Sequence, residues 1–117
     1  MYKVLIVEDD ETIAMSLQKV LTQWDYDVKC VTDFKEVMND FINFNPHLVL
    51  LDISLPYFNG YHWCAEMRKL SQIPIIFISS MSDNMNIVMA MNMGGDDFIS
   101  KPFNKEELII RVSHQIS

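Results

Sequence analysis

Acidic, hydroxyl and ammonium side chains follow short apolar runs of the sequence. They are Glu8, Asp9, Asp52, Ser79 and Lys101. If those runs are parallel strands, their carboxyl ends meet at one edge of a sheet, where open α/β domains bind ligands. Three carboxylates at such an edge repel one another unless a cation lies among them. Because the acids offer hard oxygen ligands without a nearby His or Cys, the pattern favours Mg²⁺, or Mn²⁺, over zinc.

The same side chains suit phosphoryl chemistry. A carboxylate such as Asp52 can accept a phosphoryl group covalently. A lysine and a hydroxyl beside it, here Lys101 and Ser79, suit an anion with several oxygens. The protein then mainly positions the reacting groups and neutralises charge. Simpler interpretations exist for single residues. Asp10 is better explained as an acid that compensates a helix dipole, and in isolation Ser79 would be a helix cap and Phe98 a core aromatic.

Five short segments predict the strands of a sheet, and four of them lead into these residues. The apolar runs span residues 4–7, 48–51, 75–78 and 98–99, and residues 28–31 form a further short strand that we expect at an edge of the sheet. Leu48–Leu51 is uniformly apolar, which is typical of a strand buried on both faces of a parallel sheet. Helical patterns alternate with the strands, and right-handed crossovers then favour a doubly wound α/β domain with helices on both faces. We expect a single domain over residues 1–117, because a chain of this length is too short for two cores.

Amphipathic patterns predict the first two helices and the residues that they bury. The first helix carries an apolar stripe of Ile13, Ala14, Leu17, Val20, Leu21 and Trp24. The second carries Phe34, Val37, Met38, Phe41 and Ile42. Asp33 and Glu36 have the spacing of a capping box at the start of the second helix. Asn45-Pro46 ends it, because the residue before a proline avoids the α region.

Turn and cap signals delimit the remaining helices. Asn59-Gly60 begins the third, which runs to about Leu70. The fourth runs from Asn84 to Met93 and ends at Gly94-Gly95. We interpret its methionines first as adaptable core filling and otherwise as a partner surface; they are Met85, Met89, Met91 and Met93. Asn104 and Glu107 predict the start of the last helix, whose inner face comprises Leu108, Ile109, Val112 and Ile116.

Composition excludes several classes of function. The net charge is −7 without a cluster of Lys or Arg, which argues against DNA contact by this domain itself. No apolar run approaches the roughly 20 residues of a membrane span, and the first residues do not have the pattern of a signal segment. Cys30 and Cys64 lack the spacing of a metal site or a disulfide framework. We therefore expect reduced thiols and a cytoplasmic location.

Four motifs together resemble the receiver domain of bacterial two-component response regulators. They are Val7-Glu8-Asp9-Asp10, Leu51-Asp52 with Pro56 and Gly60, Ile78-Ser79-Ser80, and Asp96-Asp97-Phe98-Ile99-Ser100-Lys101-Pro102-Phe103. The motifs cover the whole chain in the family's order and at its spacing. The resemblance implies a flavodoxin-like fold with strand order 2-1-3-4-5. It also implies a signalling switch that a sensor histidine kinase phosphorylates in the presence of Mg²⁺.

The resemblance assigns roles around the acidic cluster. Asp52 would be the phosphoacceptor. Asp9 would bind Mg²⁺ directly, Glu8 would act mainly through a ligating water, and Ser54 would contribute its backbone carbonyl. Asp52 would be a ligand as well as the acceptor.

The resemblance also assigns the residues that respond to phosphorylation. Ser79 would form a hydrogen bond with the phosphoryl group, and Lys101 would pair with it. Phe98 would be the aromatic switch, whose ring moves inward when Ser79 swings toward the phosphate. The Lys101-Pro102 peptide bond would be cis, a form that X–Pro bonds adopt at low cost.

Some residues are similar to one branch of the family in particular. Asp96, Asp97, Glu107 and Arg111 resemble the winged-helix (OmpR/PhoB-type) transcription factors, which dimerise through the fourth helix, fifth strand and fifth helix. Ile87 and Met93 stand where that branch usually has charges, so a dimer would be more apolar. The expected output interface comprises Ile87, Met91, Asp96, Asp97, Glu107 and Arg111. The segments 59–64 and 92–98 resemble regulators that sense peptide antibiotics and envelope stress in Gram-positive bacteria.

We expect a switch that catalyses its own phosphorylation and dephosphorylation, not an enzyme with a separate substrate. It would be the regulatory half of a longer DNA-binding regulator, with a free-standing receiver as the other arrangement.

A Mg²⁺-dependent phosphohydrolase with an aspartyl nucleophile is the alternative, although such enzymes usually carry a second acid where this chain has Ser54. An FMN-binding electron carrier is a weaker alternative, because no Ser/Thr/Gly-rich phosphate loop follows the first strand. Neither Ser54 nor Met81 offers a carboxylate or an amide to orient an attacking water, so we expect a long-lived phosphoryl group.

Overall fold

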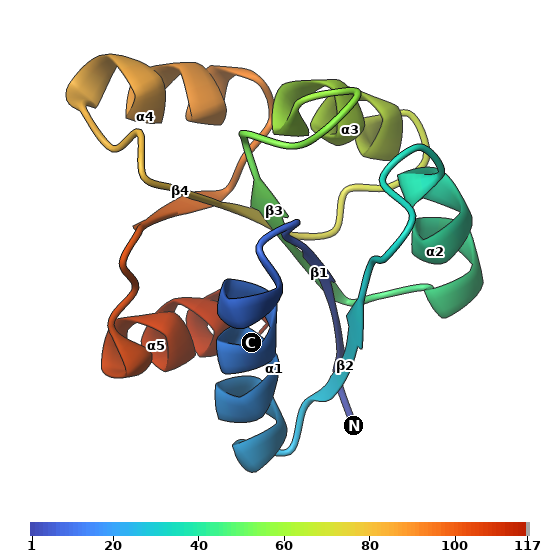
Figure 1. Ribbon diagram of the computed structural model, residues 1–117, viewed down its shortest axis with the longest axis vertical. Helices are drawn as coiled ribbons and strands as arrows, with labels where there is room; N and C mark the ends of the chain where they lie inside the picture. Colours follow the sequence, from blue (N-terminus) through green and yellow to red (C-terminus); the bar gives the residue numbers. More distant parts are fainter. Residues whose placement is uncertain (117) are drawn as a thin grey trace.

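Five parallel strands form one sheet in the order β2-β1-β3-β4-β5 in the computed structural model, which describes residues 1–116 (Figure 1). The strands are β1 (Lys3–Val7), β2 (Asp27–Cys30), β3 (Leu48–Asp52), β4 (Ile75–Ser79) and β5 (Asp97–Ser100). The helices are α1 (Glu11–Gln23), α2 (Val37–Phe44), α3 (Gly60–Arg68), α4 (Asn84–Asn92) and α5 (Lys105–Ile116). The predicted doubly wound fold and its strand order are therefore confirmed.

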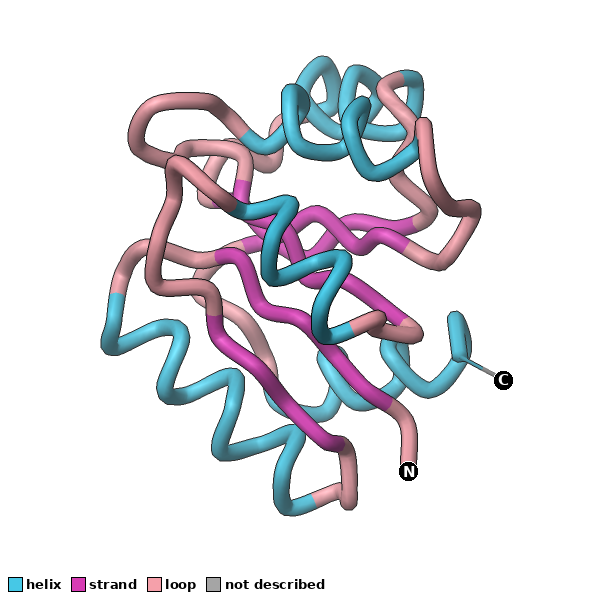
Figure 2. The backbone as a smooth tube through the Cα atoms, turned by 90° about the vertical axis from the view of Figure 1, so that its right-hand side faces the viewer, coloured by secondary structure: helices cyan, strands magenta, loops and turns pink. Residues whose placement is uncertain are grey.

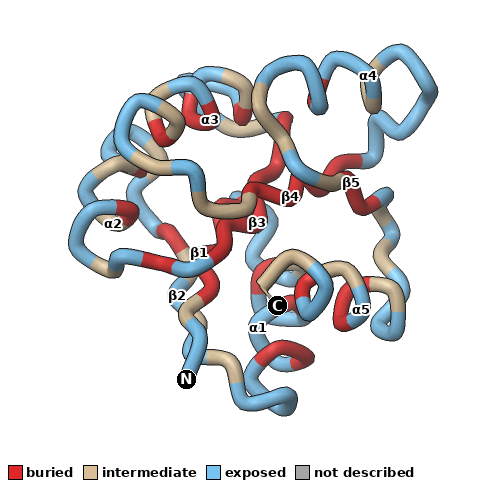
Figure 3. The backbone as a smooth tube through the Cα atoms, turned by 180° about the vertical axis from the view of Figure 1, so that it is seen from behind, coloured by how far each residue is buried: buried red, intermediate tan, exposed pale blue. Residues whose placement is uncertain are grey.

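Helices cover both faces of the sheet, as Figure 2 shows. Residues of α1 and α5 pack on one face, and residues of α2, α3 and α4 pack on the other. The apolar residues of β1 alternate between these two clusters, since Leu5 and Val7 join the second while Val4 and Ile6 join the first. Each residue of β3 and β4 is buried (Figure 3). The sheet interior is thus a rigid base for the residues at its edge.

The ends of the strands are aligned by the sheet register. Val7 pairs with Leu51, Asp52 with Ile78, and Ser79 with Ser100. The residues that follow β1 and β5 and those that end β3 and β4 consequently meet at one edge. β2 is the outermost strand of the sheet on the side of β1, as predicted.

Several predicted caps are present. The Asp10 carboxylate accepts hydrogen bonds from the backbone N–H groups of Thr12 and Ile13 at the start of α1, which confirms its interpretation as a helix N-terminal acid. Asn104 accepts one from the N–H of Glu107 at the start of α5. Gly94 follows α4 with φ of +112°, the left-handed conformation that glycine adopts at low cost.

The start of α2 differs from the prediction. The helix begins at Val37, and its N-cap residue, Glu36, forms no side-chain cap hydrogen bond. Asp33 instead accepts a hydrogen bond from the N–H of Lys35 in the preceding turn. The predicted capping box is therefore wrong, because a local turn uses the Asp33 carboxylate before the helix starts.

Two predicted core positions and the predicted end of the third helix face solvent. Trp24 is 62% exposed because α1 ends at Gln23 and the chain turns at Asp25, whose φ is +66°. Ile42 is 59% exposed because it lies five residues after Val37, away from the face that Val37 and Phe41 bury. Leu70, the expected last residue of the third helix, lies beyond α3 and is 62% exposed.

The methionines of α4 do not fill the core. Their exposed fractions are 73% for Met85, 49% for Met89, 41% for Met91 and 42% for Met93. α4 contacts the sheet through the small residue Ala90, its one fully buried residue, and it carries no charged residue. The first interpretation of these side chains is wrong, and their exposure is consistent with the second, a partner surface.

The two thiols are free. Cys64 is buried and Cys30 is half-buried, and burial raises the pKa of both thiols. Within residues 1–116, no helix has the length and apolarity that crossing a membrane requires.

We predict that neighbouring substitutions in α2 have opposite outcomes. Phe41→Ala should lower the free energy of unfolding by about 3–5 kcal/mol, because it removes a buried ring from the core. Ile42→Ala should change it by less than about 0.5 kcal/mol, because Ile42 is exposed. Urea unfolding followed by circular dichroism measures both. Equal losses would contradict the orientation of α2.

Candidate functional site

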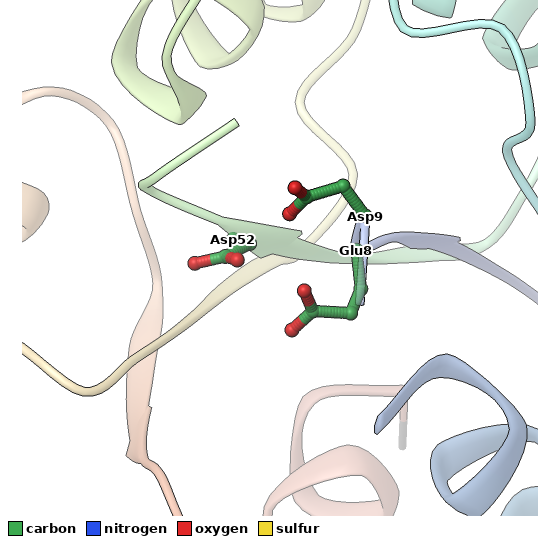
Figure 4. A group of neighbouring side chains, drawn as sticks. All are labelled: Glu8, Asp9 and Asp52. Carbon is green, nitrogen blue, oxygen red and sulfur yellow. The ribbon is translucent and has the colours of Figure 1, made fainter. Parts of the chain in front are cut away.

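Three carboxylates gather at the carboxyl edge of the sheet, as Figure 4 shows. Glu8 and Asp9 directly follow β1, and Asp52 is the last residue of β3. Their ligand oxygens lie within 4.8 Å of one another. Glu8 and Asp52 are each 3% exposed, whereas Asp9 is exposed. The sheet therefore brings the three predicted acids together as a cluster that could hold a divalent cation from its solvent side.

Lys101 supplies positive charge to this cluster. Its ammonium lies 3.0 Å from Oδ2 of Asp52 and also pairs with Oε1 of Glu8. The Lys101 side chain is 14% exposed. Burial alone would lower the pKa of Lys101, but the hydrogen bonds to Glu8 and Asp52 raise it above its ordinary value. Lys101 is therefore a permanent cation between two buried acids.

The charges of the buried cluster do not balance. Burial raises the pKa of Glu8, and the hydrogen bonds from Lys101 and from the N–H of Asp10 offset only part of this effect. The carboxylate of Asp52 raises the Glu8 pKa further. Lys101 is paired with both Glu8 and Asp52, and Asp9 adds a third carboxylate beside them. The negative charge therefore exceeds the positive charge, and a second cation would be stabilised here.

The backbone of the β5–α5 connection positions Lys101. Its N–H donates to the carbonyl of Ser79 at 2.9 Å, and the Lys101-Pro102 peptide bond is cis, as expected. β4 and β5 are already paired at Ser79 and Ser100. The Lys101 side chain thus leaves the sheet directly beside the end of β4.

Ser79 lies at the same edge but has another partner. It is 1% exposed, and its hydroxyl oxygen accepts a hydrogen bond from the N–H of Met81 at 3.0 Å. In this arrangement the hydroxyl caps the β4–α4 turn. The ring of Phe98, opposite Phe77 in the sheet, is buried in the core. The switch roles of Ser79 and Phe98 stay predictions.

Ser54 lies on the loop beside the acceptor. Its N–H donates to Oδ1 of Asp52 at 3.3 Å. Ser54 itself is exposed. The loop therefore contacts the carboxylate through its backbone, which is compatible with the predicted role of the Ser54 carbonyl as a ligand.

The expected output interface separates into groups. Arg111 pairs with Asp97 at 2.6 Å and with Glu107 at 3.7 Å, so these three residues form one network on β5 and α5. Met91 is exposed and Ile87 is half-buried on α4. Asp96 belongs to a different network, because its Oδ2 accepts hydrogen bonds from Arg68 at 2.7 Å and from the N–H of Ile75 at 2.9 Å.

Sequence reasoning missed Arg68, which holds the end of α4. Its guanidinium also donates to the carbonyls of Gly94 and Ile73, and the thiol of Cys64 donates to the carbonyl of Met93. Arg68 follows Cys64 by four residues, one turn of the same helix face. The spacing of Cys64 and Arg68 on one helix face is the signal that the sequence offers.

The sequence matches a family model described as the response regulator receiver domain over residues 4–113. The chain belongs to this family. This receiver domain is 44% identical over 110 residues to response regulator protein GraR of Staphylococcus aureus (strain NCTC 8325 / PS 47), with 94% of this chain and 49% of GraR covered. The chain thus spans about half the length of GraR.

Solved structures show the same fold. The N-terminal domain of the nisin resistance regulator NsrR, a lantibiotic response regulator, superposes with a TM-score of 0.92 at 50% identity, covering 100% of this chain and 99% of that one. The BeF₃-activated receiver domain of Klebsiella pneumoniae RstA gives 0.92 at 30% identity, with 97% of each chain covered. The predicted flavodoxin-like receiver domain of a two-component response regulator is confirmed.

We predict that Lys101 stabilises the two buried acids. Lys101→Met should lower the free energy of unfolding by about 3–5 kcal/mol in EDTA, because Glu8 and Asp52 lose their shared counter-charge. Added Mg²⁺ should restore part of this loss by binding the folded state. Urea unfolding with and without Mg²⁺ measures both effects.

A surface lysine provides the control. Lys69→Met removes an exposed pair with Glu66 and should leave stability nearly unchanged, with or without Mg²⁺. Equal destabilisation by the two substitutions would contradict the assigned role of Lys101.

Proposed function

We propose that this receiver domain accepts a phosphoryl group on Asp52 from a phosphohistidine of a sensor histidine kinase. The observation that carries the proposal is the buried Asp52 carboxylate, which belongs to an acidic cluster and contacts the ammonium of Lys101. An anionic phosphoryl group next to three acids needs this positive charge and more. The family membership of the chain supports the same reaction.

The donor set fits a Mg²⁺ ion. Glu8, Asp9, Asp52 and the Ser54 carbonyl would hold it, and all of them offer the oxygen ligands that Mg²⁺ prefers. When bound, the ion neutralises charge on the phosphoryl oxygens. Mn²⁺ has similar ligand preferences and would substitute.

The transfer forms one bond and breaks another. An Oδ of Asp52 attacks phosphorus, and the bond between phosphorus and the donor's imidazole nitrogen breaks. The electron pair of that bond stays on the imidazole, and the product is an acyl phosphate at Asp52. Lys101 already contacts Asp52 and would pair with a phosphoryl oxygen, so it stabilises the added charge without leaving its place.

Ser79 would transmit the change. To bind the phosphoryl group, its hydroxyl would turn from the N–H of Met81 toward Asp52. That rearrangement frees the β4–α4 turn and favours one arrangement of Phe98 and the output interface. Phosphorylation can shift this equilibrium only by the difference between its interactions in the two states.

The switch would regulate transcription through a separate DNA-binding segment in the cytoplasm. Curated relatives such as GraR are about twice the length of this chain, which leaves room for an output domain. NsrR is named a lantibiotic response regulator and a nisin resistance regulator. By similarity we propose that the present regulator responds to peptide antibiotics, with residues 1–117 as its receiver domain.

We predict that acetyl phosphate and Mg²⁺ add about 80 Da to the protein, the mass of one phosphoryl group. Asp52→Asn should abolish the adduct because it removes the nucleophilic carboxylate while keeping its shape. Intact mass spectrometry measures this. Asp97→Asn, which alters a surface acid paired with Arg111, should still form the adduct.

The same assay separates the alternatives. A wild-type protein that never carries the adduct but continuously releases phosphate would be a phosphohydrolase. A stable adduct supports the switch, and its decay after donor removal measures the phosphoryl lifetime. Since Ser54 and Met81 offer no carboxylate or amide to orient a water, we expect decay slower than seconds.

We predict phosphorylation-dependent dimerisation through α4, β5 and α5. Beryllofluoride, which mimics the phosphoryl group, should convert monomer to dimer in sedimentation experiments. Met91→Glu should weaken the dimer more than tenfold, because it places a charge on an apolar contact surface. Met15→Glu, at an exposed methionine of α1, should have no effect. A dimer that Met91→Glu leaves intact would use another surface.

A further inference from the structure

The start of α3 lies directly against the backbone of Asp52. Gly60 is the first residue of α3 and is buried. A Cβ atom at this position would lie 2.1 Å from the carbonyl oxygen of Asp52, 2.9 Å from its carbonyl carbon and 3.0 Å from Cα of Ile53. All three atoms belong to the main chain, so no side-chain rotation can relieve the contact.

The sheet cannot yield at this contact. Asp52 ends β3, which is paired with β1 on one side and β4 on the other, and each residue of β3 is buried. Moving its backbone would disturb two ladders and the packed core.

The loop is also held in place. The N–H of Gly60 donates to the carbonyl of Ile53 at 2.8 Å, which closes residues 53–60 on themselves. Within this loop the N–H of Phe58 bonds to the carbonyl of Pro56. The Asn59 side chain caps α3 by accepting from the N–H of His62 at 3.0 Å. Residues 53–60 thus form a closed loop that begins after Asp52 and ends with Gly60 in contact with the Asp52 main chain.

Backbone conformation does not explain the glycine. The positive φ value recorded for a glycine belongs to Gly94, not to Gly60. An alanine at position 60 would therefore be acceptable for its dihedral angles, and only the space against Asp52 excludes it.

We infer that Gly60 is a positioning residue for phosphoryl acceptance. Its missing side chain lets α3 begin against the main chain of Asp52, and this contact sets the direction of the Asp52 carboxylate and the place of the Ser54 loop. The inference rests on the proposed function of Asp52. A Cβ would force the two segments about 1 Å apart to reach an ordinary carbon–oxygen contact of roughly 3.3 Å. A displacement of that size at a reacting group can cost about 100-fold in rate.

The test compares Gly60→Ala with Gly95→Ala in the whole chain. Gly95 is the control because its added Cβ would also clash, at 2.6 Å from the ring of Phe77 and 3.0 Å from the carbonyl oxygen of Ala90, but away from Asp52. We expect Gly60→Ala to form the Asp52 adduct about 100-fold more slowly at saturating Mg²⁺ while circular dichroism shows a folded protein. Gly95→Ala should lose stability but react at the wild-type rate.

Two further readouts distinguish positioning from general destabilisation. In Gly60→Ala, the rate of Asp52 phosphorylation should fall by the same factor with acetyl phosphate and with phosphoramidate as the donor, because the defect lies in the acceptor and not in binding either donor. Its affinity for Mg²⁺, measured by calorimetry, should also fall, because the Ser54 loop moves. Neither readout should change in Gly95→Ala.

Each outcome decides the inference. If Gly60→Ala reacts within threefold of wild type, or if Gly95→Ala is slowed equally, the positioning role is wrong while the proposed function stands. If wild type itself takes up no phosphoryl group, the proposed function fails and the inference with it. If Gly60→Ala does not fold, the phosphorylation rate of Asn59→Ala is measured instead, since this variant loosens the start of α3 without a clash. A several-fold slower phosphorylation of Asn59→Ala supports the positioning role, and a wild-type rate contradicts it.

Discussion

The concentration of negative charge at one edge of the sheet governs this structure. Glu8 and Asp52 are buried beside Asp9, and Lys101 is the cation that contacts both buried acids. Burying carboxylates is costly unless they are paired or bind a cation. The parallel strands, the register and the β5–α5 connection all serve to hold these opposed charges within contact distance. A site that favours added positive charge is the consequence, and it leads to the chemistry of a receiver domain.

The features predictable from sequence are those set by local pattern. Leu48–Leu51 is apolar without interruption, and such a run has few alternatives to a buried strand. Parallel strands then place Asp52, Ser79 and Lys101 at one edge whatever the details of the helices. The acidic cluster could be predicted because it needs only the strand order and the residue that ends each strand.

The features that were missed depend on how elements pack against one another. Trp24 and Ile42 are apolar, yet Trp24 lies just past the end of α1 and Ile42 lies off the buried face of α2, so both side chains are exposed to solvent. The methionines of α4 follow a helical pattern, but that pattern does not show that Ala90 is the buried residue of the helix. The contact of Gly60 with Asp52 requires the loop to return to its starting point, which no local signal encodes.

The hydrogen bonds from Arg68 and Cys64 to the carbonyls of Gly94 and Met93 affect how α4 can move. The carboxyl end of the helix is fastened to α3, whereas its amino end follows the turn that Ser79 holds and forms no side-chain cap hydrogen bond. Nine residues at about 1.5 Å each give a helix about 13 Å long. With the carboxyl end as the pivot, a tilt of about 10° moves the amino end by about 2 Å. A small rearrangement at the β4–α4 turn is thereby enlarged along an uncharged, solvent-facing helix.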